Sequence, residues 1–152
     1  KGQSVSSLVC ISTRGVMGVV TKDGAFDRND VIVFLTGLIA RCRELLRRQV
    51  TIVWDNARIH HAVDVVDFLE DNGIRYMFLP AYTPELNPIE NFFGTVKEAY
   101  SRDGVVTTRA EMKRRIEAKM NEVDRNVDMR GYYAHMREYI VKSLRREPFF
   151  RQ

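Results

Sequence analysis

The sequence lacks any apolar run close to the roughly 20 residues that a membrane-spanning helix needs. It also opens without the charged and apolar pattern of a secretory signal peptide. We therefore expect an intracellular protein with no membrane partner, nuclear if eukaryotic and cytoplasmic if bacterial. Because residue 1 is Lys and not Met, we also expect a piece of a longer protein.

Cysteine is scarce, and internal repeats and low-complexity segments are missing altogether. The two cysteines, Cys10 and Cys42, lie in apolar surroundings and have no Cys or His neighbour at zinc-ligand spacing. This argues against a structural zinc site. Buried free thiols are favoured over a disulfide, which fits a reducing compartment.

The length of 152 residues favours a single domain over residues 1–152. Charge is unevenly distributed along it. Residues 1–96 hold ten Lys and Arg against eleven Asp and Glu, a net charge of −1, whereas residues 97–152 hold fourteen against nine, a net charge of +5. A basic C-terminal part suits a polyanionic partner, although a solvated helix face explains it equally well.

The hydrophobic pattern predicts an α/β fold in which strands and helices alternate. The apolar run that ends at Trp54 is typical of a strand buried on both faces. The early part of the chain is expected to contain, in order, a hairpin of Val5–Ser12 and Val16–Val20, a helix that starts at Asp27 or Asn29, a strand at Val50–Trp54, a helix from about Ala62, and a strand at Ile74–Leu79.

The second half of the chain is predicted to be helical after a proline-rich loop from Pro80 to Pro88. Asn87 is a good helix N-cap, and Pro88 suits the first position of the helix that follows. Thr108 and Glu111 have the spacing of a capping box for another helix. A last helix is expected from about Met129 to Leu144, as a helical C-terminal extension.

Two acids stand out by their positions. Asp55 ends a predicted parallel strand, and catalytic groups of open α/β sheets collect beyond such strand ends. Glu90 falls in the first turn of a predicted helix, where the helix dipole favours the ionised carboxylate. Mg²⁺ prefers oxygen ligands and would offset the repulsion of two such groups. Each acid alone also has a simple structural explanation, a turn for Asp55 and helix initiation for Glu90.

The segments that hold these acids, VWDNARIHHA and LPAYTPELNPIEN, resemble two blocks of mariner-type transposases and bacterial insertion-sequence transposases, whose catalytic part is a DDE endonuclease domain. The 34 residues between Asp55 and Glu90 match the family spacing. The resemblance implies a ribonuclease H-like mixed sheet flanked by helices. It also implies that Asp55 and Glu90 are catalytic residues that bind Mg²⁺, with Mn²⁺ as a substitute.

One departure from the family pattern concerns the first of its three acids, which lies on the first, central strand of the sheet. The hairpin matches the second and third strands of the family, so we expect the first strand and its acid to lie before Lys1. None of the acids after the hairpin resembles it.

Other candidate residues lie close to the two blocks. Asn56 and His60 match family positions and are auxiliary candidates, with a plain turn and a structural helix start as the alternatives, and His61 is expected at the surface. Tyr82 could stack on a base or pack within its loop. The candidates for contact with the DNA backbone, for which a solvated face is the alternative, are Arg58, Lys97, Lys113, Arg114 and Arg115.

The function that the resemblance implies is the catalytic domain of a DDE transposase. Such a domain would cleave and join DNA with Mg²⁺ and act on transposon ends and target DNA, with a homodimer as a candidate assembly. With only two of the three acids, the chain alone is expected to be inactive. The alternative is a catalytically dead remnant that binds DNA or protein.

Overall fold

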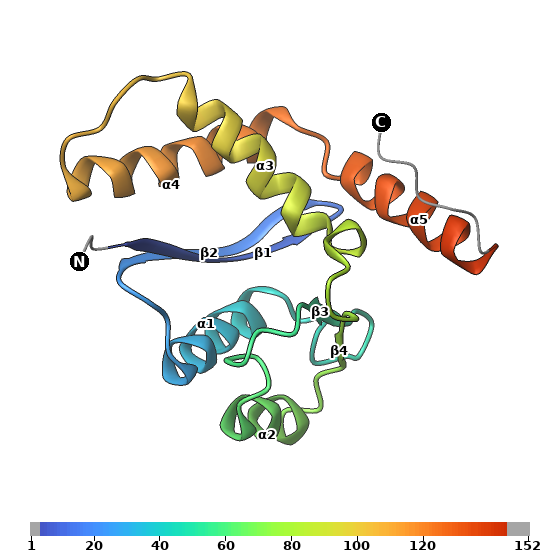
Figure 1. The fold of residues 1–152 in the computed structure, drawn as a ribbon. Coiled ribbons are helices and arrows are strands. Elements are labelled where there is room, and N and C mark those ends of the chain that lie inside the picture. The colour runs from blue at the N-terminus through green and yellow to red at the C-terminus, as the bar shows by residue number, and fades with distance from the viewer. Residues whose placement is uncertain (1–3, 146–152) are drawn as a thin grey trace.

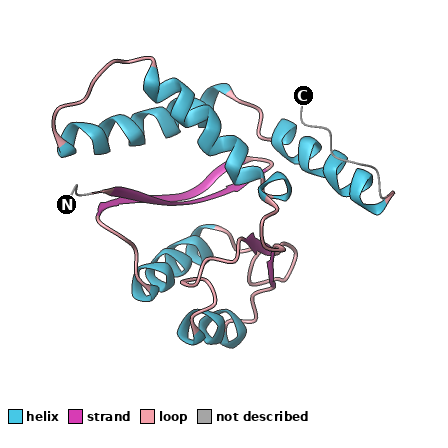
Figure 2. Cartoon of the chain, in the orientation of Figure 1, coloured by secondary structure: helices cyan, strands magenta, loops and turns pink. Residues whose placement is uncertain are grey.

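The computed structural model describes residues 4–145. It has an α/β architecture in which a long hairpin lies between two groups of helices (Figures 1 and 2). The elements in chain order are β1 (Val5–Ser12), β2 (Gly15–Asp23), α1 (Arg28–Arg41), β3 (Ile52–Trp54), α2 (Val63–Asp71), β4 (Tyr76–Phe78), the 3₁₀ turn η1 (Pro84–Leu86), α3 (Pro88–Ser101), α4 (Arg109–Asn126) and α5 (Arg130–Leu144).

The β1–β2 hairpin separates two hydrophobic cores. Its strands pair antiparallel, with a register shift between Cys10 and Ile11. Successive side chains of a strand point to opposite faces, so Leu8 and Cys10 pack on the core formed by α1 and α2. Val9 and Ile11 pack on the core formed by α3 and α4. Figure 1 shows this layering, with α1 on one side of the hairpin and α3 and α4 on the other.

The second sheet is the parallel pair β3–β4, joined through α2 as predicted. Trp54 and Tyr76 pack toward the core of α1 and α2. The adjacent pair Val53 and Met77 points the other way and stays 41% and 53% exposed. The prediction that this strand is buried on both faces is therefore wrong. The reason is that no layer of residues 4–145 covers the outer face of β3–β4.

The α/β class is confirmed, but the described residues form two separate two-stranded sheets instead of one mixed sheet. In β1, the bonding pattern shows which groups lie on the unpaired edge. The amide of Gly24 donates to the carbonyl of Ser4 at 2.7 Å, and hydrogen-bonded pairs alternate along an antiparallel ladder. The β1 residues whose backbone groups point away from β2 are therefore Val5, Ser7 and Val9.

In β3, one residue lies with its backbone groups on the unpaired edge. The amide of Ile52 donates to Arg75 at 2.9 Å, and Trp54 accepts from the amide of Leu79 at 2.8 Å. Bonds of a parallel pair involve every second residue of a strand. The backbone groups of Val53 consequently point to the edge opposite β4, where no described strand pairs with them.

The helix starts follow the predicted caps. Asp27 and Asp30 form a reciprocal capping box on α1. Asn87 accepts from the amide of Ile89 at the start of α3, and Thr108 accepts from that of Glu111 at the start of α4. The predicted helical extension is α5, which projects beyond α3 in Figure 1 and buries no residue of its own. No helix within residues 4–145 has the length and apolarity to cross a membrane.

Candidate active site

Asp55 follows β3 directly, as the sequence predicts. Its carboxylate contacts other residues through only one of its two oxygens, Oδ1. Oδ1 accepts a hydrogen bond from the amide of Ala57 at 3.0 Å and lies 3.0 Å from Nδ1 of His60. The side chain is 56% exposed. No group within residues 4–145 bonds to Oδ2, so this oxygen is open to solvent or a ligand.

Glu90 lies in the first turn of α3. Asn87 and Pro88 start this helix, and the backbone amide of Glu90 donates to the carbonyl of Asn87 at 3.0 Å. The carboxylate is exposed and forms no ion pair or hydrogen bond with another described residue. It therefore remains available at the positive end of the helix dipole.

Two neighbouring histidines after β3 stack on aromatic rings of the two parallel strands. His60 stacks on Trp54 at a centroid distance of 4.6 Å, with 8° between the ring planes. His61 stacks on Phe78 of β4 at 3.8 Å, with 17° between the planes. Since Trp54 and Phe78 are themselves stacked at 5.8 Å, the four rings fix the turn after β3 against both strands.

Asn56 joins the ends of the two parallel strands. Its Nδ2 donates to the carbonyl of Leu79, just after β4, at 2.6 Å. Its Oδ1 lies 2.8 Å from Nε2 of His61. Asn56 thus does more than form a turn. The ring of His61 is at the surface as expected, but its bond to Asn56 had no signal in the sequence, because it depends on Phe78 and Leu79 of another strand.

The basic candidates divide into two groups. Arg115 is only 16% exposed in its side chain and donates to the carbonyl of Gly104 at 2.7 Å. It also pairs with Glu111 at 3.5 Å and lies over the ring of Tyr100, which favours a structural role. The candidates that make no ion pair within the described part of the chain are Arg58, Lys97, Lys113 and Arg114.

Tyr82 belongs to the loop that leads from β4 toward Glu90. Its side chain is fully exposed, so packing within the loop, one of the two interpretations of this residue, is wrong. Its backbone has a φ of 60°, a left-handed conformation that is uncommon outside glycine. The hydroxyl of Thr83 donates to the carbonyl of Pro80 at 2.6 Å and constrains the same loop. The aromatic ring is thus held out into solvent.

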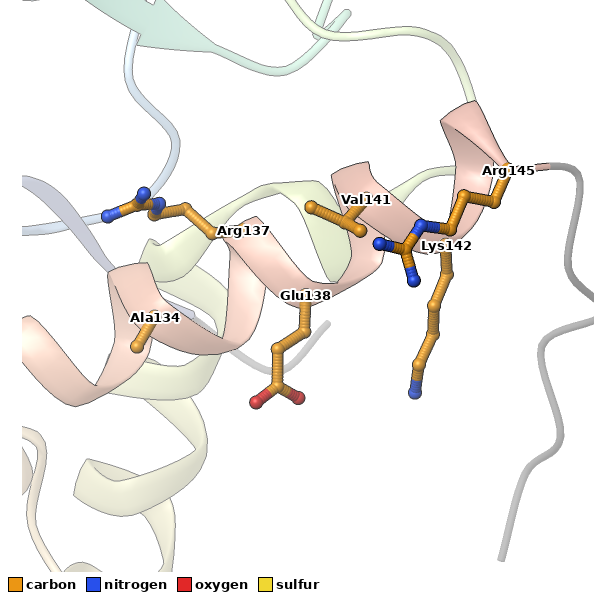
Figure 3. A pocket seen from close by; sticks show the side chains of 6 residues that line it. All are labelled: Ala134, Arg137, Glu138, Val141, Lys142 and Arg145. Carbon is orange, nitrogen blue, oxygen red and sulfur yellow. The ribbon is translucent and has the colours of Figure 1, made fainter.

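Two further observations concern metal-binding groups and pockets within the described residues. Among residues 4–145, no three His, Cys, Asp or Glu side chains gather as a metal-binding group. The shared metal of Asp55 and Glu90 therefore stays a prediction. A shallow pocket, shown in Figure 3, is lined by residues of α5 and by its C-cap Arg145, and neither of the two acids lines it.

The domain is of the α/β class, with one open carboxylate after a parallel strand and a second at a helix start, an arrangement compatible with a metal-dependent nuclease. The family comparison gives the particular kind. Residues 1–113 match the DDE superfamily endonuclease family, and the chain belongs to this family of nucleases and transposases. Asp55 and Glu90 both fall within the matched region.

Known relatives agree with this assignment. The chain is 27% identical over 104 residues to the transposable element Tc3 transposase of Caenorhabditis elegans, and the match covers 68% of this chain but only 31% of that protein. The Mos1 transposase catalytic domain, solved with Raltegravir and Mg, superposes with a TM-score of 0.77 at 20% identity, over 99% of this chain and 79% of that one.

A larger Mos1 structure, the mariner paired end complex with Mn, gives a TM-score of 0.78 at 19% identity. It covers 99% of this chain and 46% of that one. The fold of the chain is thus that of the Mos1 catalytic domain, which confirms the expected ribonuclease H-like class.

Proposed function

We propose that this chain forms most of a catalytic domain that cuts and joins DNA strands in transposition with the help of Mg²⁺, or Mn²⁺ in its place. The observation that carries the proposal is the pair of open carboxylates, Asp55 and Glu90, inside the region that matches the DDE family. Solved Mos1 structures with Mg, with Mn and as a strand transfer complex support divalent metal and DNA as its ligands.

The donor chemistry of the two acids fits Mg²⁺. This ion is usually bound through one or two carboxylates and keeps several water molecules. Oδ2 of Asp55 and both oxygens of Glu90 are open within the described structure. When bound there, metal ions would activate a water molecule or a 3′ hydroxyl and stabilise the leaving oxygen.

The residues around the acids prepare them for this role. Ala57 and His60 hold Oδ1 of Asp55, so the carboxylate keeps one orientation and presents Oδ2. Glu90 lies at the start of α3, where a negative charge interacts favourably with the helix dipole. Lys97 and Arg114 would contact DNA phosphates as unpaired cations, and such contacts position the nucleic acid without reading its sequence.

We further propose that a strand carrying the third acid lies between β1 and β3. The two unpaired edges described above support it, because edge groups of both strands face no partner within residues 4–145. The indole Nε1 of Trp54 is also buried without an acceptor in that part of the chain, and such a group costs about 1–3 kcal/mol.

Hydrogen exchange tests the open edges. In the 152-residue chain, the amides of Val5, Ser7 and Val9 should exchange much faster than those of Ser6 and Leu8, which bond to β2. Equal protection along β1 in a monomer would mean that its outer edge is already paired, and the proposed place of the missing strand would be wrong.

A DNA nicking assay with Mg²⁺ and Mn²⁺ tests the activity. Any metal-dependent nicking should disappear in Asp55→Asn and in Glu90→Gln. It should persist in Glu85→Gln, a matched control that removes an acid from the loop leading to Glu90. Nicking that survives Asp55→Asn would overturn the assignment of the two acids.

The second candidate function is a DNA-binding or protein-binding remnant without catalysis. It is favoured by the lack of any group of three metal-binding side chains within residues 4–145. This function predicts equal DNA binding by wild type, Asp55→Asn and Glu90→Gln, and no broadening of the Asp55 and Glu90 amide signals by Mn²⁺. A homodimer stays a prediction from the resemblance, and nuclear or cytoplasmic localisation stays a prediction from the sequence pattern.

A further inference from the structure

Two neighbouring contacts of similar spacing lie in the turn after β3. Asp55 contacts His60, and the next residue, Asn56, contacts the next histidine, His61. Asp55 is bound by His60, which stacks on Trp54 of β3. Asn56 is bound by His61, which stacks on Phe78 of β4. The sequence indicates no role for His61, yet its ring hydrogen-bonds the side chain of Asn56. His60 lies 3.0 Å from Oδ1 of Asp55 and 3.4 Å from the backbone carbonyl of the same residue.

The hydrogen bonds of Asn56 define the tautomer of His61. The Nδ2 group of Asn56 donates to the carbonyl of Leu79 at 2.6 Å, which leaves Oδ1 as the atom that faces His61 at 2.8 Å. An amide oxygen only accepts hydrogen bonds, so Nε2 of His61 must carry the proton. Stacking on Phe78 holds the ring in the plane that this bond requires.

The resulting chain of contacts runs from β4 back to β3 and ends beside Asp55. The carbonyl of Leu79 is its last acceptor, and the amide of Leu79 also donates to Trp54 at 2.8 Å. Leu79 is the first residue of the segment that leads through the proline-rich loop to Glu90. Asp55 follows β3, and Glu90 lies further along the chain after β4. The hydrogen bond between Asn56 and Leu79 joins the ends of these two strands.

We propose that His61 is a positioning residue for the DDE site. Through Asn56 it holds the start of the loop to Glu90 against the end of β3, and so fixes the relative placement of the two carboxylates. His61 itself touches neither metal nor DNA. The inference rests on the proposed function only in the part that concerns metal binding.

Three variants separate the contributions of the ring, the proton and the amide. His61→Phe keeps the stacking ring but removes the N–H donor. His61→Gln keeps an N–H donor at the same number of bonds from the backbone but removes the ring. Asn56→Asp keeps the acceptor for His61 but replaces the donor to Leu79 with an oxygen. His135→Phe, on α5, is the matched control, because it removes an exposed histidine far along the chain.

The first readout needs no metal. In the wild type, ¹⁵N spectra should show His61 with its proton on Nε2. Losing one exposed hydrogen bond makes local opening about two- to tenfold more frequent, so the Leu79 amide should exchange faster by that factor in His61→Phe and Asn56→Asp. His61→Gln should restore slow exchange, and the melting temperature should stay that of His135→Phe.

The second readout is the broadening of amide signals at Asp55 and Glu90 by Mn²⁺. Loss of a group that orients a metal ligand typically weakens metal binding by 10- to 100-fold, and we expect about tenfold in His61→Phe. If the wild type shows no broadening, the metal part of the proposed function fails, while Leu79 exchange still decides the role of His61.

Three results would overturn the inference. One is unchanged exchange of the Leu79 amide in His61→Phe. Another is equally fast exchange in His61→Gln, because the ring would then matter and the hydrogen bond would not. The third is a proton found on Nδ1 of His61 and not on Nε2.

Discussion

The end of the hairpin is fastened to α4 by one carboxylate, and this contact allows a quantitative test of the core arrangement. Oδ1 of Asp124 accepts the backbone amide of Val16 at 2.7 Å. Gly15, next to it, has a φ of +124°. A Cβ placed on Gly15 would lie 2.6 Å from the same oxygen. Gly15→Ala must therefore strain the backbone and displace Asp124.

The two costs can be separated. A non-glycine residue in this backbone region costs about 1–3 kcal/mol, and losing a hydrogen bond to a charged acceptor costs about 1.5–3 kcal/mol. Gly15→Ala should thus destabilise the chain by roughly 2.5–6 kcal/mol. Asp124→Ala loses the hydrogen bond alone. The double variant keeps the backbone strain and lacks the same hydrogen bond that Gly15→Ala has already lost. Its stability should therefore equal that of Gly15→Ala, although it carries a second substitution.

The assay is urea unfolding of the wild type, the two single variants and the double variant, with the free energy of unfolding compared in a double-mutant cycle. The expected coupling between the sites is about 1.5–3 kcal/mol. Asp124→Asn, which keeps an acceptor oxygen, should lose less than Asp124→Ala. Additive effects, within about 0.5 kcal/mol, would refute the reasoning, because they would mean that Gly15 and Asp124 do not share this contact.

Three further predictions concern a thiol, an aromatic ring and two cations. Burial raises the pKa of the Cys10 thiol to about 11 from 9.0, so the folded chain keeps a proton that the unfolded chain loses first. Stability should fall by about 2–3 kcal/mol as pH rises from 9 to 11, and Cys10→Ala should flatten this slope in unfolding curves. Tyr82→Ala should weaken binding of single-stranded DNA by about 1–3 kcal/mol, while Tyr82→Phe binds normally; equal titrations for both variants would argue against base stacking. Lys97→Ala and Arg114→Ala should each lower the salt dependence of DNA binding by about one unit of slope, and an unchanged slope would remove that residue from the interface.

Local signals in the sequence were enough to predict most of the elements. The caps at Asp27, Asn87 and Thr108 use short-range hydrogen bonds, so their residue types locate helix starts directly. The parallel strands were also predicted, but with longer bounds. Their apolar runs, such as the one ending at Trp54, extend beyond the residues that pair, and hydrophobic residues in a sequence do not reveal whether a second layer covers them.

The candidate site was predicted in part. Asp55 and Glu90 lie in ordered motifs, and the family assignment by residues 1–113 agrees with the resemblance of those motifs. The role of His61 could not be predicted, because its hydrogen bond and its stacking ring come from contacts across two strands. Arg115 looked like one of three neighbouring cations, yet its side chain is held by Gly104 and Glu111.

The sequence by itself determined the α/β alternation, the helix caps and the family, because each rests on residue types within local segments, and it singled out Asp55 and Glu90 as candidate acids. Only the tertiary structure decided how the hairpin divides two cores, which edges of β1 and β3 stay unpaired, and which polar groups fasten the turn after β3. These properties depend on residues that are far apart in the chain and adjacent in space, such as Val16 and Asp124, and no local pattern records such a pairing.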